Sequence, residues 1–224
     1  MTIKQTLIMM SASLLISLPA LAKKYPDVSE DGLTRVKHKT VDAAYFDTQS
    51  DLSVYRQVAI ADIEVEFRKN WQRDQNRTRR DVQHQITDED MDRMRSEVAA
   101  ELRDVFTQEL EEGGYPVVGS AGEDVLLISP KIVDLDIWAP DVYQRSAGRT
   151  TAYTENSGYL TLNMDLADSE SEAVIGRVID RRRGRGDMTV RQTNLVTNKQ
   201  DARRVMRRWA WVVRDALDEA RSIN

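Results

Sequence analysis

The sequence of 224 residues contains no cysteine and only two histidines, His38 and His84. The absence of cysteine excludes disulfides, thiolate-ligated zinc, iron–sulfur clusters and anchoring through a lipidated cysteine. Both histidines lie in loosely patterned segments without a partner at the spacing of metal ligands, which disfavours a histidine-based metal site or catalytic triad. We therefore expect neither a metal nor another cofactor.

Sequence motifs of common catalytic and nucleotide-binding sites are also missing. There is no nucleophile elbow and no phosphate-cradling loop, and Gly184-Arg185-Gly186 is too short for a dinucleotide-binding fingerprint. The formal net charge of -5 lacks the basic character of a nucleic-acid-binding protein, so we predict no nucleic-acid partner. With 41% hydrophobic and 31% charged residues, the composition is that of an ordinary globular protein.

Long apolar runs are confined to the N-terminus. Lys4 precedes an apolar stretch over residues 7–18, and Ala20-Leu21-Ala22 follows shortly after it. Small side chains at these positions suit a signal peptidase, whereas an uncleaved anchor needs about 20 apolar residues to span a bilayer. We therefore predict a signal peptide over residues 1–22 and a periplasmic mature chain without a lipid or a membrane span.

The remaining sequence predicts an N-terminal arm followed by one domain. Residues 23–56 are polar and loosely patterned, which indicates an extended arm with short strands at most. Within the domain, residues 57–224, the alternation of apolar and polar side chains over residues 59–67 predicts a strand. The almost entirely polar residues 68–85 predict a long exposed loop.

Two stretches of the domain carry the apolar stripe of an amphipathic helix. Thr87 and Asp90 form a capping-box pattern and Gly113-Gly114 supplies a stop, so a helix is predicted over residues 88–112. A second helix is predicted from a cap at Asn198 to the C-terminus. Its apolar stripe includes Trp209 and leaves Trp211 outside.

The other apolar segments predict strands. Pro130 interrupts one of them, and because proline lacks a backbone N–H, this strand should lie at an edge or bulge there. The Asp168 to Ser171 turn predicts a hairpin, and Arg181 to Gly186 a second turn. The predicted strands cover residues 115–118, 125–128, 132–138, 160–166, 173–179 and 188–193. The order of elements predicts an α+β fold, a two-layer sandwich with two amphipathic helices packed on one face of a mainly antiparallel sheet.

Several segments, spread from about Asp31 to Arg221, carry a family resemblance. They are Asp51-Leu52-Ser53-Val54-Tyr55, Met91-Asp92-Arg93-Met94, residues 113–118, 121–126 and 132–135, the hairpin at 168–175, and Arg207-Arg208-Trp209-Ala210. Together they resemble a family of bacterial secreted proteins, many of them lipoproteins, catalogued as domain of unknown function 3313. This chain departs from the family in lacking a lipobox cysteine, and the family supplies no catalytic residues.

More loosely, the layout resembles small periplasmic domains of envelope-assembly proteins, such as the amino-terminal domain of the Tol translocation protein and curli-secretion lipoproteins. Our first hypothesis is a non-catalytic, protein-binding or envelope-assembly role with an envelope protein or glycan as partner. Because a fold does not determine a function, this remains an expectation.

Exposed tryptophans and arginines are the residue types that anchor partner surfaces, although they also cap the edges of cores. On this basis, the candidate partner-binding residues are Trp138, Arg181, Arg182, Arg183, Arg207, Arg208 and Trp211. The polar stretch after residue 67 suggests an alternative, the binding of a phosphate-bearing anion, although such charges are often simply solvated. The candidate anion-binding residues are Arg68, Lys69, Arg73, Arg77, Arg79 and Arg80.

A further alternative is an envelope enzyme, for instance a glycan hydrolase. Asp134 and Asp136 lie two residues apart in a predicted strand, so both should project from one face. Paired carboxylates can act as acid and base or bind calcium, and Asp141 would complete a cluster. The competing interpretation is a solvent-facing strand edge whose carboxylates pair with arginines.

Overall fold

The computed structural model describes residues 24–77, 85–137, 152–154, 158–183, 191–193 and 195–223, so the predicted signal peptide lies outside it. The helices are α1 (Trp71–Arg77), α2 (Asp88–Glu112), α3 (Leu195–Ile223) and the short 3-10 helix η1 (Leu52–Val54). The strands are β1 (Thr34–Val36), β2 (Ala43–Phe46), β3 (Gln57–Ile60), β4 (Glu64–Phe67), β5 (Val117–Val118), β6 (Val125–Asp136), β7 (Ala152–Thr154), β8 (Tyr159–Asp168), β9 (Val174–Arg183) and β10 (Arg191–Thr193).

Within these described residues, one large sheet has the strand order β1-β2-β9-β8-β6-β3-β5, with β4 also paired to β6. The pairs β1–β2, β2–β9, β9–β8 and β8–β6 are antiparallel. The pairs β6–β3, β6–β4 and β3–β5 are parallel. A separate small sheet joins β7 and β10. The predicted α+β class is confirmed, and the sheet is mixed.

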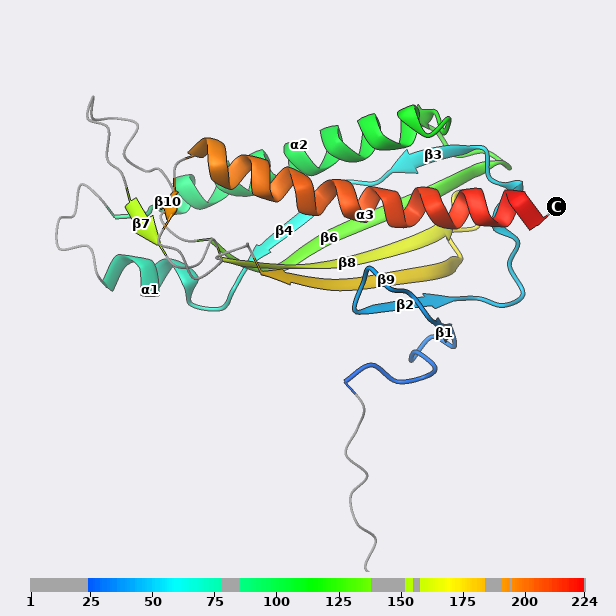
Figure 1. Ribbon diagram of the computed structural model, residues 1–224, viewed down its shortest axis with the longest axis horizontal. Coiled ribbons are helices and arrows are strands. Elements are labelled where there is room, and N and C mark those ends of the chain that lie inside the picture. The colour runs from blue at the N-terminus through cyan, green and yellow to red at the C-terminus, as the bar shows by residue number, and fades with distance from the viewer. Residues whose placement is uncertain are drawn as a thin grey trace, which may run out of the picture.

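Helices α2 and α3 lie across the same side of the large sheet (Figure 1). Their apolar stripes meet the inward side chains of β6, β8 and β9 in one core. Fully buried members include Phe106 and Leu110 of α2, Trp209 of α3, and Ile128 and Leu162 of the sheet. Burying one such side chain is worth about 1.5–3 kcal/mol, so the two stripes hold the helices to the sheet.

The N-terminus of α2 has the capping box that the sequence predicts. The backbone N–H of Asp90 donates to Thr87 Oγ1 at 3.2 Å, and the N–H of Thr87 donates to Asp90 Oδ2 at 3.1 Å. The hydrogen bond from Thr87 is the main reason that the pKa of Asp90 lies below its usual range. The prediction for α3 was wrong at its start, because the helix begins at Leu195 and Asn198 lies inside it.

The edge or bulge predicted at Pro130 is also wrong. Strand β6 is internal, and its pairing with β8 runs through Pro130 and Met164 without a shift. Ile128 accepts from the Ala61 N–H at the end of β3, so Pro130, two residues later, faces the same side. On that side, the strand predicted over residues 59–67 is divided into β3 and β4. Pro130, which lacks a backbone N–H, therefore faces the gap between these two strands.

The polar stretch after residue 67 contains a helix instead of only a loop. Helix α1 buries Trp71, which is 1% exposed, stacks on Phe67 with ring centroids 4.5 Å apart and donates to the Ile137 carbonyl at 3.1 Å. A second small core forms around Trp71, with Met91 and Met94 of α2. One buried indole therefore organises a segment whose other side chains are polar.

Residues 23–56, predicted as an arm, add β1 and β2 to the large sheet as far as they are described. Their outward side chains Leu33 and Tyr45 form a third small core with Tyr25. Among the described residues, no helix is both long and apolar enough to cross a membrane.

Candidate functional site

The first half of α3 is strongly cationic. Residues 202–214 contain no acidic side chain and carry Arg203, Arg204, Arg207, Arg208 and Arg214. The helical repeat turns Trp209 into the core, where it is fully buried, and leaves Trp211 on the outside, where it is 41% exposed. We refer to Arg203, Arg204, Arg207, Arg208 and Trp211 as the α3 stripe.

The exposed indole of Trp211 is held by a buried carboxylate. Its Nε1 donates to Glu109 Oε2 of α2 at 2.6 Å, and Arg207 forms an ion pair with the same carboxylate, with Nε 2.7 Å from the other oxygen, Oε1. Glu109 is 6% exposed, so its charge is compensated almost entirely by these two groups. The contact fixes the Trp211 ring while leaving much of it in solvent.

The remaining arginines of the stripe differ in their contacts. Arg203 pairs with Glu101 of α2, which makes a second bridge between the helices. Arg203, Arg204, Arg207 and Gln200 line a hollow of about 290 Å3 beside the stripe. Arg208 is partly exposed and has no carboxylate partner within the described part of the chain. The stripe therefore carries four arginines, of which Arg203 and Arg207 pair with carboxylates of α2.

The structure does not bring the predicted β9 arginines to this surface. Asp180 faces α3, so Arg181 projects from the opposite face of the sheet, where its guanidinium lies over Tyr159, with Cζ 5.2 Å from the ring centroid. Arg182 is engaged internally, because its Nε donates to the buried Asp180 at 2.6 Å. Arg183 ends β9, which corrects the turn predicted from residue 181. Trp138 lies outside the described residues.

Of the four described residues in the predicted anion-binding set, Arg68 and Arg73 pair with carboxylates. Arg68 donates to Asp136 and to Asp74, both at 3.0 Å, and Arg73 pairs with Asp74 at 3.2 Å. The hydrogen bond from Arg68 is the main cause that lowers the pKa of Asp74. Lys69 and Arg77 are exposed, whereas Arg79 and Arg80 lie outside the described residues.

The carboxylates of the enzyme alternative lie at an irregular part of β6. The pairing of β6 shifts between Val133 and Asp136, and Asp134 sits at this irregularity with a φ of 53°. Asp136 accepts from Arg68 Nε at 3.0 Å, and Asp134 is exposed. Asp141 and His84 lie outside the described residues, and His38 Nδ1 accepts from the backbone N–H of Thr40 at 3.1 Å. In the described segments, no group of three or more His, Cys, Asp or Glu residues is arranged to hold a metal.

Sequence reasoning missed two buried carboxylates, Glu109 and Asp180. Glu109 occupies an apolar-stripe position of α2 beside Leu110, and Asp180 an inward position of β9 two residues after Val178. A charged residue on a stripe that is otherwise apolar is the signal that would have found both. Such a residue needs a buried donor, and a tryptophan Nε1 supplies one in each case.

Several solved bacterial proteins match this chain at low identity and with TM-scores below 0.5. A PelC dodecamer from Paraburkholderia phytofirmans is 11% identical, with a TM-score of 0.36, and the match covers 74% of this chain and 94% of that one. A minor lipoprotein from Acinetobacter baumannii is 12% identical over 75% of this chain and 96% of that one, with a TM-score of 0.35. A DUF4136 family protein from Bacteroides thetaiotaomicron is 12% identical over 78% and 95%, with a TM-score of 0.36.

No curated protein matches this chain. A family model described as "Protein of unknown function (DUF3313)" matches residues 22–212, which is most of the chain and agrees with the resemblance seen in the sequence. The chain therefore belongs to the DUF3313 family of proteins of unknown function.

Proposed function

We propose that this protein is a non-catalytic, periplasmic binding module of the cell envelope that docks an acidic protein partner on the α3 stripe. The observation that carries the proposal is the state of Trp211, which is 41% exposed and yet fixed by its bond to Glu109. An exposed large aromatic side chain with its polar atom already satisfied offers apolar area at little further cost in desolvation or ordering.

The arginines of the α3 stripe support an acidic partner. Of the arginines within residues 202–214, Arg203 and Arg207 are balanced by carboxylates of α2, whereas Arg208 has no such partner in the described chain. Arginine and tryptophan are the residue types most enriched in binding hot spots. A partner surface with carboxylates around a small apolar recess would complement this combination.

Photo-crosslinking in cells tests the docking surface. A photoreactive residue at Arg208 should give a discrete adduct, and one at Asn163, on the face of the sheet away from the helices, should not. The same adduct should be lost in a chain that also carries Trp211→Ala. An adduct that forms equally from Asn163, or that survives Trp211→Ala, would contradict the proposal.

Export is the second part of the proposal and has its own test. The apolar stretch over residues 7–18 and the small residues before Lys23 support cleavage after Ala22, and the lack of cysteine supports a lipid-free product. N-terminal sequencing of the protein from a periplasmic extract should begin at Lys23. A cytosolic product that retains Met1 would contradict this localisation.

A further inference from the structure

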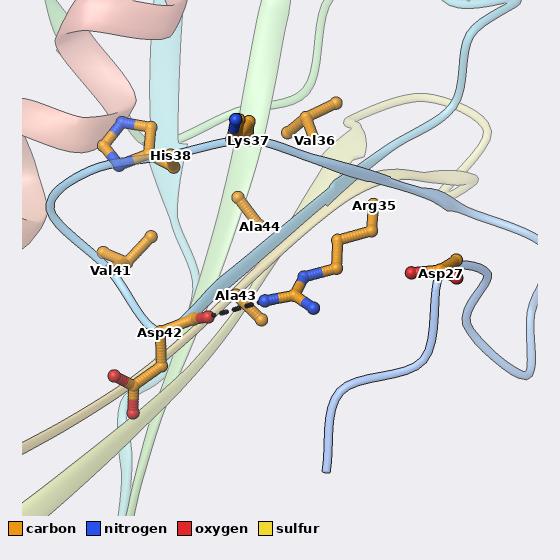
Figure 2. A pocket seen from close by; sticks show the side chains of 9 residues that line it. All are labelled: Asp27, Arg35, Val36, Lys37, His38, Val41, Asp42, Ala43 and Ala44. Atoms are coloured by element: carbon orange, nitrogen blue, oxygen red, sulfur yellow. Dashed lines mark hydrogen bonds between the residues drawn. The ribbon is translucent and has the colours of Figure 1, made fainter. Parts of the chain in front are cut away.

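A second feature, remote in sequence from α3, lies at the β1–β2 edge of the sheet. The loop over residues 37–42 borders a cavity of about 330 Å3, and Ala43 and Ala44 of β2 also line it (Figure 2). The lining residues that can donate hydrogen bonds from their side chains include Arg35, Lys37 and His38, which come from one short stretch of chain. The volume is within the range of small-ligand sites.

These three side chains keep hydrogen-bond donors available. Arg35 donates to the carbonyls of Tyr25 and Asp42 at 3.1 and 3.2 Å, which uses only part of the five N–H groups of a guanidinium. Lys37 is exposed and has no bonded partner among the described residues. The His38 ring accepts a hydrogen bond at Nδ1, so in the neutral ring the hydrogen is on Nε2.

Two aspartates, Asp27 and Asp42, also line the cavity, and the position of their carboxylates determines how far they offset its positive charge. The Asp42 carboxylate accepts from Tyr25 Oη at 3.3 Å and from the Arg181 N–H at 3.2 Å, and it is directed away from the Arg35 guanidinium (Figure 2). Asp27 lies at the side of the cavity nearest Arg35 (Figure 2). Lys37 and His38 lie on the loop, away from both carboxylates.

The loop that carries these donors is tied to the core. The fully buried Asp180 accepts from the backbone N–H of Asp42 at 3.2 Å, and the Arg182 guanidinium donates to the Thr40 carbonyl. Val41, between these two anchors, is 8% exposed and belongs to the main core. Anchoring at three successive residues fixes the loop before any ligand arrives, which lowers the entropic cost of binding.

We propose that this cavity is a binding site for a phosphate monoester, with Arg35, Lys37 and His38 as its donors. Arginine and lysine form short, charge-assisted hydrogen bonds to phosphate oxygens, and a monoester presents three such oxygens. The site is independent of the α3 stripe, because it shares no residue with it.

Isothermal titration calorimetry of the purified protein with glycerol 3-phosphate at low ionic strength tests the site, with glycerol as the uncharged control ligand. Lys37→Gln should weaken binding by about tenfold, the effect of one charge-assisted hydrogen bond. Lys39→Gln is the matched control, because Lys39 is exposed on the same loop and does not line the cavity; its affinity should stay within about twofold. Absence of binding, or equal weakening by both variants, would overturn the proposal.

The source of the phosphate group, a soluble ester or a lipid, is resolved by a second arm. Phosphatidylcholine vesicles with and without phosphatidic acid are floated with the protein and with both lysine variants. Co-flotation that requires phosphatidic acid and Lys37, but not Lys39, supports a lipid source; calorimetric binding without co-flotation supports a soluble ester. Co-flotation that both variants retain equally would overturn the assignment of the cavity as the lipid site.

Discussion

Two tryptophans two residues apart on α3 make nearly the same contact in different surroundings. Trp209 donates to Asp180 at 2.7 Å, and Trp211 donates to Glu109 at 2.6 Å. Each carboxylate is buried and also forms an ion pair with an arginine, Arg182 in the first case and Arg207 in the second. The difference lies in the indole ring, which is fully buried at Trp209 and 41% exposed at Trp211.

This difference separates stability from recognition. A carboxylate–indole contact inside the core joins α3 to β9 and to the β1–β2 loop, and it contributes to folding. The same contact at the surface joins α3 to α2 and leaves an oriented aromatic ring in solvent. We therefore expect substitutions at the two sites to affect different measurements.

The largest expected effect is on folding stability. Trp209→Ala should lower the free energy of unfolding by about 3–5 kcal/mol, because it opens a cavity in the core and leaves Asp180 without one donor. Trp211→Ala should cost about 1 kcal/mol, since much of that ring is already exposed. Urea denaturation followed by circular dichroism measures both. Equal losses would show that the two contacts are not distinct in role.

An intermediate effect is expected from the carboxylates. Asp180→Asn should lower the free energy of unfolding by about 1–3 kcal/mol. The NH₂ group of the asparagine amide is itself a donor and cannot accept from the donors that surround Asp180, and the side chain lacks the charge that balances Arg182. Glu109→Gln should cost about 1 kcal/mol, because Arg207 can turn toward water. A larger loss for Glu109→Gln than for Asp180→Asn in the same denaturation assay would reverse the comparison.

The smallest expected effect on stability at neutral pH concerns Tyr55 and Tyr115, which contact the C-terminal end of α3. Burial, and then the neighbouring carboxylates Asp168 and Asp218, raise the pKa of Tyr55 and Tyr115 from 10.0 to about 12. The resulting stability is fully present below pH 10.0 and is lost as the pH rises through about 12. The alkaline titration of tyrosinate absorbance measures this, and Tyr115→Phe should remove one late-titrating group. Titration of every tyrosine near its ordinary pKa would contradict the expectation.

Local patterns predicted the parts of the fold that depend on local chemistry. The Thr87 cap and Gly113-Gly114 gave the bounds of α2, and the apolar stripe of α3 distinguished buried Trp209 from exposed Trp211. Helix α1 escaped prediction because its position depends on one side chain, Trp71, that packs against residues distant in sequence.

The sites were less predictable because they depend on long-range contacts. Arg68 was assigned to an anion site, and it forms an ion pair with Asp136, 68 residues away. The β1–β2 cavity is shaped by Asp180, which binds the N–H of Asp42 across 138 residues of sequence. A single sequence carries the residue types of such contacts but not their pairing.

The most direct test of the central claim compares stability and binding in one variant. Once the cross-linked partner is purified, isothermal titration calorimetry gives its dissociation constant for the unmodified protein and for Trp211→Ala. We expect the variant to bind at least about tenfold more weakly while remaining folded. An unchanged dissociation constant in a folded Trp211→Ala protein would contradict the account.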